Sequence, residues 1–196
     1  TYGYMDKLGQ IFRKTNMGTD GEVPQFSSFT YIYPSIRQSG DNLCTSLYKT
    51  ISYANNILLH VAAPQFSDPR LQRIQAEAYG LRAFLHFDLV RLFAEDYQRG
   101  KDSRGIPYSY NFNLKNRTVY TVAGTYENIL KDLDEARKRI TALAGLVTAA
   151  APEIGSQHAA PLRDGLRTLQ LAFREASPFP DEPGKGPGEK LTGPVY

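Results

Sequence analysis

The sequence predicts an all-α fold of helical hairpins. Three stretches, 41–62, 68–96 and 121–147, carry apolar residues every three or four positions, which is the period of one helix face. Asp41 and Asp68 favour a helix N-terminus at the start of the first two stretches, and Pro64 ends the first. Only a few residues connect the first two stretches, so we expect these helices to be antiparallel neighbours.

The stretch 68–96 is the one around which we expect the rest of the chain to pack. Asp68 is a favourable N-cap and Pro69 suits the first helical position. One apolar set follows one face and a second set lies on another side: Leu71, Ile74, Ala78, Leu81, Leu85, Leu89 and Leu92, then Ala76, Ala83, Phe87, Val90 and Ala94. A helix that is apolar on more than one face needs other helices around it.

The N-terminal third is less regular. Residues 2–13 predict a weak amphipathic helix, because two glycines lower the helix propensity. Residues 16–40 are rich in Gly, Ser, Thr and Pro, have interleaved aromatic residues and lack a helical period, so we expect a long loop there. In the helix over 41–62, Asn55 and Asn56 occupy interior positions, where Asn competes with the backbone and is mildly unfavourable.

The third helix follows a polar loop over 97–117. Its apolar residues have the most regular spacing in the chain: Val122, Tyr126, Ile129, Leu133, Ala136, Ile140, Leu143 and Val147. The opposite face is charged, which indicates a solvated surface. Helix pairs joined by short turns suggest a scaffold of the tetratricopeptide kind, although the full repeat signature is absent.

Three regions follow from this pattern. We expect residues 1–150 to form one helical region with long irregular loops. Residues 151–177 are interpreted as a linker followed by one short helix. Residues 178–196 are rich in Gly and Pro without an apolar period, so we expect an irregular tail.

Composition excludes several classes of function. Apolar residues make up 41% of the chain and charged residues 22%, which fits a globular protein. The formal net charge of +3 is small and its cations are interspersed with anions, so we expect no nucleic-acid partner. No stretch approaches the roughly 20 apolar residues that span a membrane. A single cysteine, Cys44, rules out a disulfide within the chain.

No motif in the sequence indicates catalysis, a metal or a cofactor. His60, His86 and His158 fall on different predicted elements and lack the spacing of metal ligands. Glu77 and Arg82 are charged residues in the most apolar helix, and buried charges need partners. We therefore interpret both as structural residues that pair with a neighbouring element, and we expect a protein that is not an enzyme.

A-E-A-x-x-x-R-A-F-x-x-F-D-L-V-R-L-F, from Ala76 to Phe93, resembles a motif of the SusD/RagB-like family of surface lipoproteins of Bacteroidota. Three further segments agree with that family in order and spacing: L-Y-K-x-I-x-x-A-N-N-I-L (Leu47–Leu58), G-I-P-Y (Gly105–Tyr108) and V-x-x-x-Y-x-x-I-x-x-D-L-x-x-A (Val122–Ala136). Thr19-Asp20 is similar to a pair that often precedes the variable loop of the family. The resemblance covers residues 16–140, the N-terminal portion of such a protein.

The resemblance implies a fold of tetratricopeptide-like hairpins and no catalysis. It implies a protein at the surface of the outer membrane that binds oligosaccharides, or another nutrient such as peptides, for uptake through a SusC-like TonB-dependent transporter. No export signal or lipid-bearing Cys is found in the sequence, so we expect membrane association only through a lipid anchor that this chain does not carry.

The resemblance transfers no individual ligand residue, so candidates come from the two aromatic-rich loops. A sugar ring has an apolar face and a rim of hydroxyl groups, which suits flat aromatic side chains with polar neighbours. The candidates are Asp20, Phe29, Tyr31, Tyr33 and Arg37 in the first loop and Tyr108, Tyr110 and Asn111 in the second. The alternative is that these aromatic residues pin long loops to the helices, since a buried Tyr often anchors a loop through its hydroxyl group.

Two other functions stay open. The chain could be a helical scaffold, or a truncated fragment without ligand binding, whose partner is another protein such as the transporter. An all-α enzyme would require two converging carboxylates or a metal cluster from different helices.

Overall fold

Helices dominate the computed structural model, which describes residues 34–61, 69–112, 118–176 and 180–196. In these ranges the helices are α3 (Pro34–Val61), α4 (Pro69–Phe93), α5 (Tyr97–Gly100), α6 (Val122–Ile154), α7 (Ser156–Ala176) and α8 (Glu189–Thr192). The strands β1 (Arg104–Pro107) and β2 (Val119–Thr121) form one small antiparallel sheet. The prediction of an all-α fold built on tetratricopeptide-like hairpins is confirmed.

The chain divides into two compact units, Thr1–Lys49 and Thr50–Tyr196. In the first unit the described residues are the N-terminal part of α3. This helix begins at Pro34, earlier than the predicted start at Asp41. Proline suits the first turn of a helix, and the Gln38 amide donates to the Asn42 side chain one turn later at 3.0 Å.

The second unit contains the hairpin of α3 and α4. Ala54 and Leu58 of α3 pack against Ala78 of α4 in one apolar cluster. The Gln75 amide donates to the carbonyl of Val61, nearer the turn. As the position on α3 advances, its partner on α4 recedes, so this part of α3 runs antiparallel to α4 as predicted.

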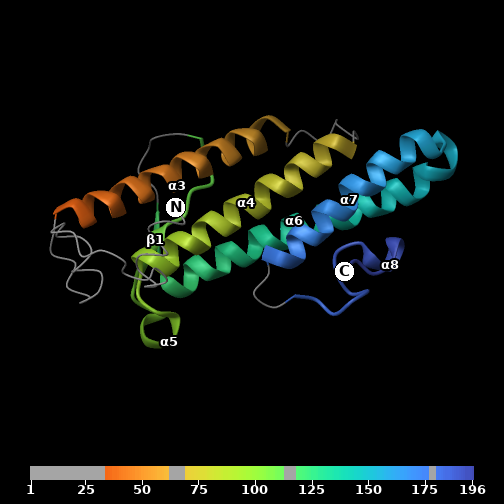
Figure 1. Ribbon diagram of the computed structural model, residues 1–196. Helices are drawn as coiled ribbons and strands as arrows, with labels where there is room; N and C mark the ends of the chain where they lie inside the picture. The colour runs from red at the N-terminus through yellow and green to blue at the C-terminus, as the bar shows by residue number, and fades with distance from the viewer. Residues whose placement is uncertain (1–33, 62–68, 113–117, 177–179) are drawn as a thin grey trace, which may run out of the picture. The chain divides into compact units, whose positions relative to one another are not determined.

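Helix α4 lies between several elements. It packs on α6, α7 and β1 (Figure 1). Its buried apolar residues come from more than one face: Ala76, Ala78, Ala83, Leu85, Leu89 and Val90. The two sets inferred from the periodicity therefore contribute unequally, because Ile74 and Leu81 of the first set are 38% and 42% exposed.

Helices α6 and α7 form a second hairpin. Thr121 caps the N-terminus of α6 by accepting a hydrogen bond from the Gly124 amide at 3.0 Å. Gly155, with φ of 74°, ends α6. Residues from both helices and from α4 build the larger of the two apolar clusters given by the described residues, here called the main apolar cluster: Ala76, Ile140, Leu143, Ala144, Val147, Leu166 and Leu169. Both helices extend through residues that the sequence assigned to a linker and one short helix.

The described C-terminal residues, 180–196, pack on this hairpin. The Gln170 amide donates to the carbonyl of Pro187 at 2.9 Å, and Arg174 donates to the carbonyl of Val195 at 2.7 Å. Arg137 of α6 forms an ion pair with Asp181 at 2.9 Å. A segment rich in Gly and Pro thus contains one helical turn, α8, and fixed contacts with two helices.

Strand β1 lies where the sequence predicted a polar loop, and β2 lies between that loop and the predicted third helix. Gly105 of β1 is close to the start of α6, since a Cβ there would lie 2.7 Å from Thr125 Oγ1 and 2.8 Å from the Thr121 carbonyl oxygen. Only glycine permits this approach, which places the segment after β1 beside α4 and α6. Within the described ranges, no helix has the length and apolar character that crossing a membrane requires.

Candidate functional site

A buried ion pair joins the two central helices. Arg82 of α4 donates from Nε and Nη2 to the two carboxylate oxygens of Asp132 on α6, at 2.7 and 2.6 Å. Burial lowers the pKa of Arg82, but the hydrogen bond and charge of Asp132 outweigh it and raise that pKa above its usual value. Their side chains are 6% and 4% exposed, so the pair is a fixed, internally neutral unit.

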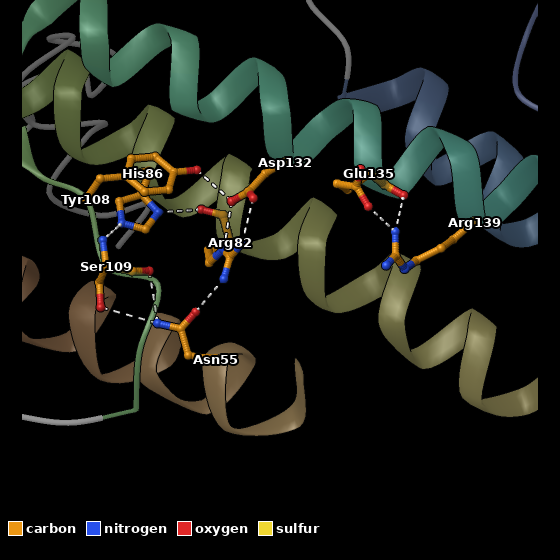
Figure 2. A network of polar contacts seen from close by, with 8 residues as sticks. All are labelled: Asn55, Arg82, His86, Tyr108, Ser109, Asp132, Glu135 and Arg139. Carbon is orange, nitrogen blue, oxygen red and sulfur yellow. Dashed lines mark hydrogen bonds and ion pairs between the residues drawn. The ribbon is translucent and has the colours of Figure 1, made fainter. Parts of the chain in front are cut away.

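Asn55 connects this pair to α3 and to the segment after β1. Its side-chain oxygen accepts from Arg82 Nη1 at 2.8 Å. Its amide nitrogen donates to the backbone carbonyl of Ser109 at 2.9 Å and also lies 3.2 Å from the Ser109 hydroxyl (Figure 2). Asn55 is 2% exposed, so these bonds compensate its burial in a helix interior.

His86 and Tyr108 complete the network. The Ser109 amide donates to His86 Nε2 at 3.1 Å, which makes Nε2 an acceptor and assigns the ring proton to Nδ1, 2.8 Å from the Arg82 carbonyl oxygen. The Tyr108 ring stacks on His86 with centroids 3.8 Å apart, and its hydroxyl donates to Asp132 at 2.7 Å. Burial, and then the negative charge of Asp132, raises the pKa of Tyr108.

An open groove lies over this network. It has a volume of about 410 Å³, and we call it the Tyr110 groove; it is lined by Asn55, Leu58, Leu59, Tyr79, Arg82, Tyr110, Asn111 and Phe112. Tyr110 is 40% exposed and Phe112 is 50% exposed. Burial, and then the charge of Asp132, raises the pKa of Tyr110 to about 12, so its hydroxyl stays protonated at neutral pH.

The buried network sets the position of the aromatic rings in the groove. The Arg82 guanidinium carbon lies 5.2 Å from the Tyr79 ring centroid and 5.0 Å from that of Tyr110. Such cation–π contacts orient both rings from one fixed cation. Since the charge of Arg82 is matched by Asp132, the groove offers aromatic faces, amides and a hydroxyl group without a strong excess charge. Those groups suit a neutral polyhydroxylated ligand.

The structure treats the eight candidate ligand residues differently. Asp20, Phe29, Tyr31 and Tyr33 lie outside the described residues. Arg37 is exposed on helix α3 rather than on a loop. Tyr108 is 3% exposed and bonded to Asp132 beneath the groove, whereas Tyr110 and Asn111 line it.

The two residues interpreted as structural also differ. Arg82 has the interhelical partner described above. Glu77 does not: its side chain is 47% exposed and pairs with Arg73 on the same helix at 2.7 Å. The expectation of an internal partner for Glu77 is corrected here. Five residues separate Glu77 from Arg82, which turns the helix by about 140° beyond one full turn, so the two cannot face the same neighbour.

Several groove and network residues were not candidates from the sequence: Asn55, Tyr79, His86, Ser109, Phe112 and Asp132. Asn55 alone gave a signal, because an Asn in a helix interior calls for a compensating partner. The described ranges contain no group of three or more His, Cys, Asp or Glu residues that could hold a metal ion. In the N-terminal unit, burial and then the charge of Asp41 raise the pKa of Cys44.

Comparison with known families identifies the group to which this fold belongs. The model of a SusD-like family, described as "Starch-binding associating with outer membrane", matches residues 13–146, which is more than half of the chain. The chain belongs to the SusD-like family. All four segments on which the resemblance was founded fall within that match. A second model, a domain of unknown function, matches residues 123–175 across α6 and α7 of this SusD-like chain.

Three solved structures from Bacteroides are similar to this chain at low sequence identity. A putative sugar binding protein from Bacteroides vulgatus is 16% identical, with a TM-score of 0.50 over 81% of this chain and 37% of its own. A SusD superfamily protein from Bacteroides thetaiotaomicron is 22% identical, with a TM-score of 0.46 over 66% and 30%. A SusD-like carbohydrate binding protein from Bacteroides vulgatus is 15% identical, with a TM-score of 0.46 over 70% and 31%.

This SusD-like chain therefore spans about a third of the length of the solved structures that it matches. The first of the three supports the helical fold. No curated protein sequence matches the chain.

Proposed function

We propose that this chain is the N-terminal portion of a non-catalytic surface protein that binds oligosaccharides. The family description, starch-binding and associated with the outer membrane, supports this function. The observation that carries it is the Tyr110 groove. Exposed aromatic rings lie there beside amide groups, over an ion pair whose charges cancel.

The chemistry of the groove favours neutral sugars. A pyranose ring stacks its apolar C–H face on an aromatic ring, and its hydroxyl groups bond to polar neighbours at the rim. Tyr110 and Phe112 supply exposed rings, and Asn111 supplies an amide. The groove volume of about 410 Å³ is within the range of small-molecule sites.

Isothermal titration against a panel of neutral oligosaccharides tests the proposal. At least one glycan should bind, and Tyr110→Ala or Phe112→Ala should weaken it by about tenfold, since stacking and burial of one ring contribute roughly 1–2 kcal/mol. Tyr196→Ala is the matched control, because Tyr196 is 81% exposed and does not line the groove. If no glycan of a broad panel gives a binding signal, that result would count against glycan binding by this chain.

The same proposal includes delivery to a transporter. We propose that the protein works at the cell surface with a SusC-like TonB-dependent transporter and is held there by a lipid anchor. Cell fractionation and surface protease treatment of the source bacterium would test this location. Recovery of the protein only from the periplasm would contradict it.

A helical interaction scaffold is the second candidate. Ile74, Leu81 and Phe84 of α4 are each at least 38% exposed, and exposed apolar side chains on one side of a helix favour protein contact. A pull-down from outer-membrane extract separates the two functions. A pure scaffold retains the transporter and gives no heat with any glycan, whereas a capture protein retains the transporter and also binds at least one glycan.

A further inference from the structure

A second cavity lies where α7 meets the C-terminal residues. Its volume is about 420 Å³, and α6, α7, α8 and residues 194–195 form its walls. Val147, Leu166 and Val195 line it and are themselves buried, so the floor is apolar. None of its lining residues lines the Tyr110 groove.

Charged side chains without partners line one wall. Arg163, Asp164 and Arg167 lie on one side of α7, at spacings of one and four residues. In the part of the chain that the structure describes, their side chains form no hydrogen bond or ion pair. Other arginines of the same hairpin do have partners, as Arg137 has in Asp181 and Arg139 in Glu135.

Gln170 directs an unused acceptor into the same cavity. Its amide nitrogen donates to the Pro187 carbonyl at 2.9 Å and to Thr192 Oγ1 at 3.2 Å, which fixes the orientation of the amide. Its Oε1 accepts no hydrogen bond from the described residues. Among the described residues, every side-chain N or O atom that is fully buried has a hydrogen-bond partner. Because Oε1 has no such partner, it is not fully buried and contacts open space. Since Gln170 is 2% exposed and lines this cavity, the cavity is that space.

These groups define the chemistry of a ligand. Two guanidinium groups bind an anion, and they outnumber the single carboxylate of Asp164. Asp164 and Gln170 Oε1 accept hydrogen bonds, as hydroxyl groups would supply. Leu191 and Pro194 offer an apolar wall to one face of a ring. The positive excess disfavours a ligand that brings an ammonium group.

We propose that this cavity, the Arg167 cavity, binds an anionic sugar: a pyranose that carries a carboxylate or a sulfate ester. The anion lies between Arg163 and Arg167, and the hydroxyl groups donate to Asp164 and Gln170. This site goes beyond the proposed function, because it is distinct from the Tyr110 groove and takes a charged rather than a neutral sugar.

The test is titration of the full chain, followed by two-dimensional amide NMR, with sodium glucuronate, glucose 6-sulfate, glucose, acetate and inorganic sulfate. The anionic sugars should bind about tenfold or more tightly than glucose, because glucose cannot form charge-assisted hydrogen bonds with the two guanidinium groups. They should also bind about tenfold or more tightly than the bare anions, because acetate and sulfate have no hydroxyl groups to donate to Asp164 and Gln170. If glucuronate binds and glucose 6-sulfate does not, the ligand is a sugar with a carboxylate. If both bind, the cavity accepts a sugar with either a carboxylate or a sulfate ester.

Variants locate the site. The double variant Arg163→Gln, Arg167→Gln should lose that affinity by about tenfold or more, whereas Arg99→Gln, at an exposed arginine outside the cavity, should not change it. Tyr110→Ala alters the groove only, so unchanged glucuronate affinity in that variant separates the two sites. Equal affinity for glucose or for acetate would overturn the proposal. So would an unaffected double variant or the absence of any binding.

Discussion

At the scale of single residues, the groove depends on one buried ion pair. Arg82 and Asp132 are joined by two hydrogen bonds, and both side chains are almost fully buried. Removal of one partner leaves the other charge in the protein interior without water, which costs more than the net worth of the pair itself. The pair also anchors Asn55 and Tyr108, so its loss reaches α3 and the segment after β1.

Asp132→Asn should therefore lower the free energy of unfolding by about 3–5 kcal/mol, the usual cost of an uncompensated buried charge. Glu135→Gln, one turn later on α6, is the matched control. Glu135 pairs with Arg139 (Figure 2) and also with Lys138, and all three side chains are partly exposed, so its replacement should cost about 1 kcal/mol or less. Urea unfolding followed by circular dichroism measures both. Equal losses in the two variants would show that the buried Arg82–Asp132 pair contributes no more to stability than a surface ion pair.

Tyr108 makes stability depend on pH in the alkaline range. Its pKa is raised in the folded state, so its contribution is complete below the unfolded pKa of about 10 and is lost as pH rises beyond that value. Tyr108→Phe should lower stability at neutral pH by about 1–3 kcal/mol, because Asp132 loses a donor, and should flatten the decline above about pH 10. Urea unfolding at several alkaline pH values measures this slope. Tyr196→Phe, at an exposed tyrosine, should leave the slope unchanged.

The sequence could predict some of these residues but not their partners. Arg82 stood out as a charge in an apolar helix, and Asn55 as an amide in a helix interior. Asp132 and Ser109 lie 50 and 54 positions from the residues they bind, and no local pattern records such a distance. Tyr108 and Tyr110 are two residues apart in one segment, yet one is buried and the other is exposed. That difference depends on the approach of α4 and α6, which periodicity does not describe.

At the scale of elements, β1 decides where the groove segment begins. Its antiparallel pairing with β2 places Arg104 opposite Thr121, the residue that caps α6. Gly105 allows this contact because a larger residue would meet the backbone of Thr121. The strand, the cap and the start of α6 are therefore one structural unit from which Tyr108 and Tyr110 extend.

Gly105→Ala should push β1 away from Thr121 and the start of α6. The new Cβ would lie 2.8 Å from a backbone oxygen that cannot rotate away, so we expect a loss of about 1–3 kcal/mol in stability and weaker glycan binding in the groove. Gly80→Ala, in the interior of α4 with no atom within 4 Å of the new Cβ, should instead stabilise the protein by about 0.5–1 kcal/mol. Thermal unfolding compares the two. A Gly105→Ala protein as stable as wild type would contradict the close approach.

Helices were easier to predict than the elements between them. The apolar period located α4 and α6 because the apolar faces of these helices are buried against long neighbours. The strands were missed because segments of four and three residues are too short to show an alternating pattern. Their pairing also joins segments that are separate in the sequence, and no local pattern indicates it. Most residues of α7 are polar, and Pro161 and Gly165 are residue types that are common in loops. The helix is stabilised by the packing of Leu166 and Leu169 against apolar residues of α6.

At the scale of the whole molecule, the C-terminal residues close the α6–α7 hairpin. Gln170 and Arg174 hold them from α7, and Arg137 holds them from α6. Gly188 gives the closest approach: its φ is 76°, and a Cβ there would lie 2.4 Å from the Cβ of Ala144 in the main apolar cluster. Such a contact cannot be inferred from a Gly- and Pro-rich composition. That composition indicates how flexible the unfolded segment is, but it does not indicate that the segment packs on the α6–α7 hairpin.

Gly188→Ala should therefore release residues 180–196 from the hairpin, with faster amide hydrogen exchange in α7 and α8 and a loss of about 2–4 kcal/mol in stability, from strain at positive φ together with the clash. Gly193→Ala gives the cost of backbone strain at positive φ without a clash, since Gly193 has φ of 85° and ψ of 167° and no atom lies within 4 Å of the new Cβ, so it should lose about 1–3 kcal/mol. In the Gly188→Ala background, Ala144→Gly removes the opposing Cβ and should restore protection in α7. If exchange in α7 does not change in Gly188→Ala, the C-terminal residues are not what holds this hairpin closed.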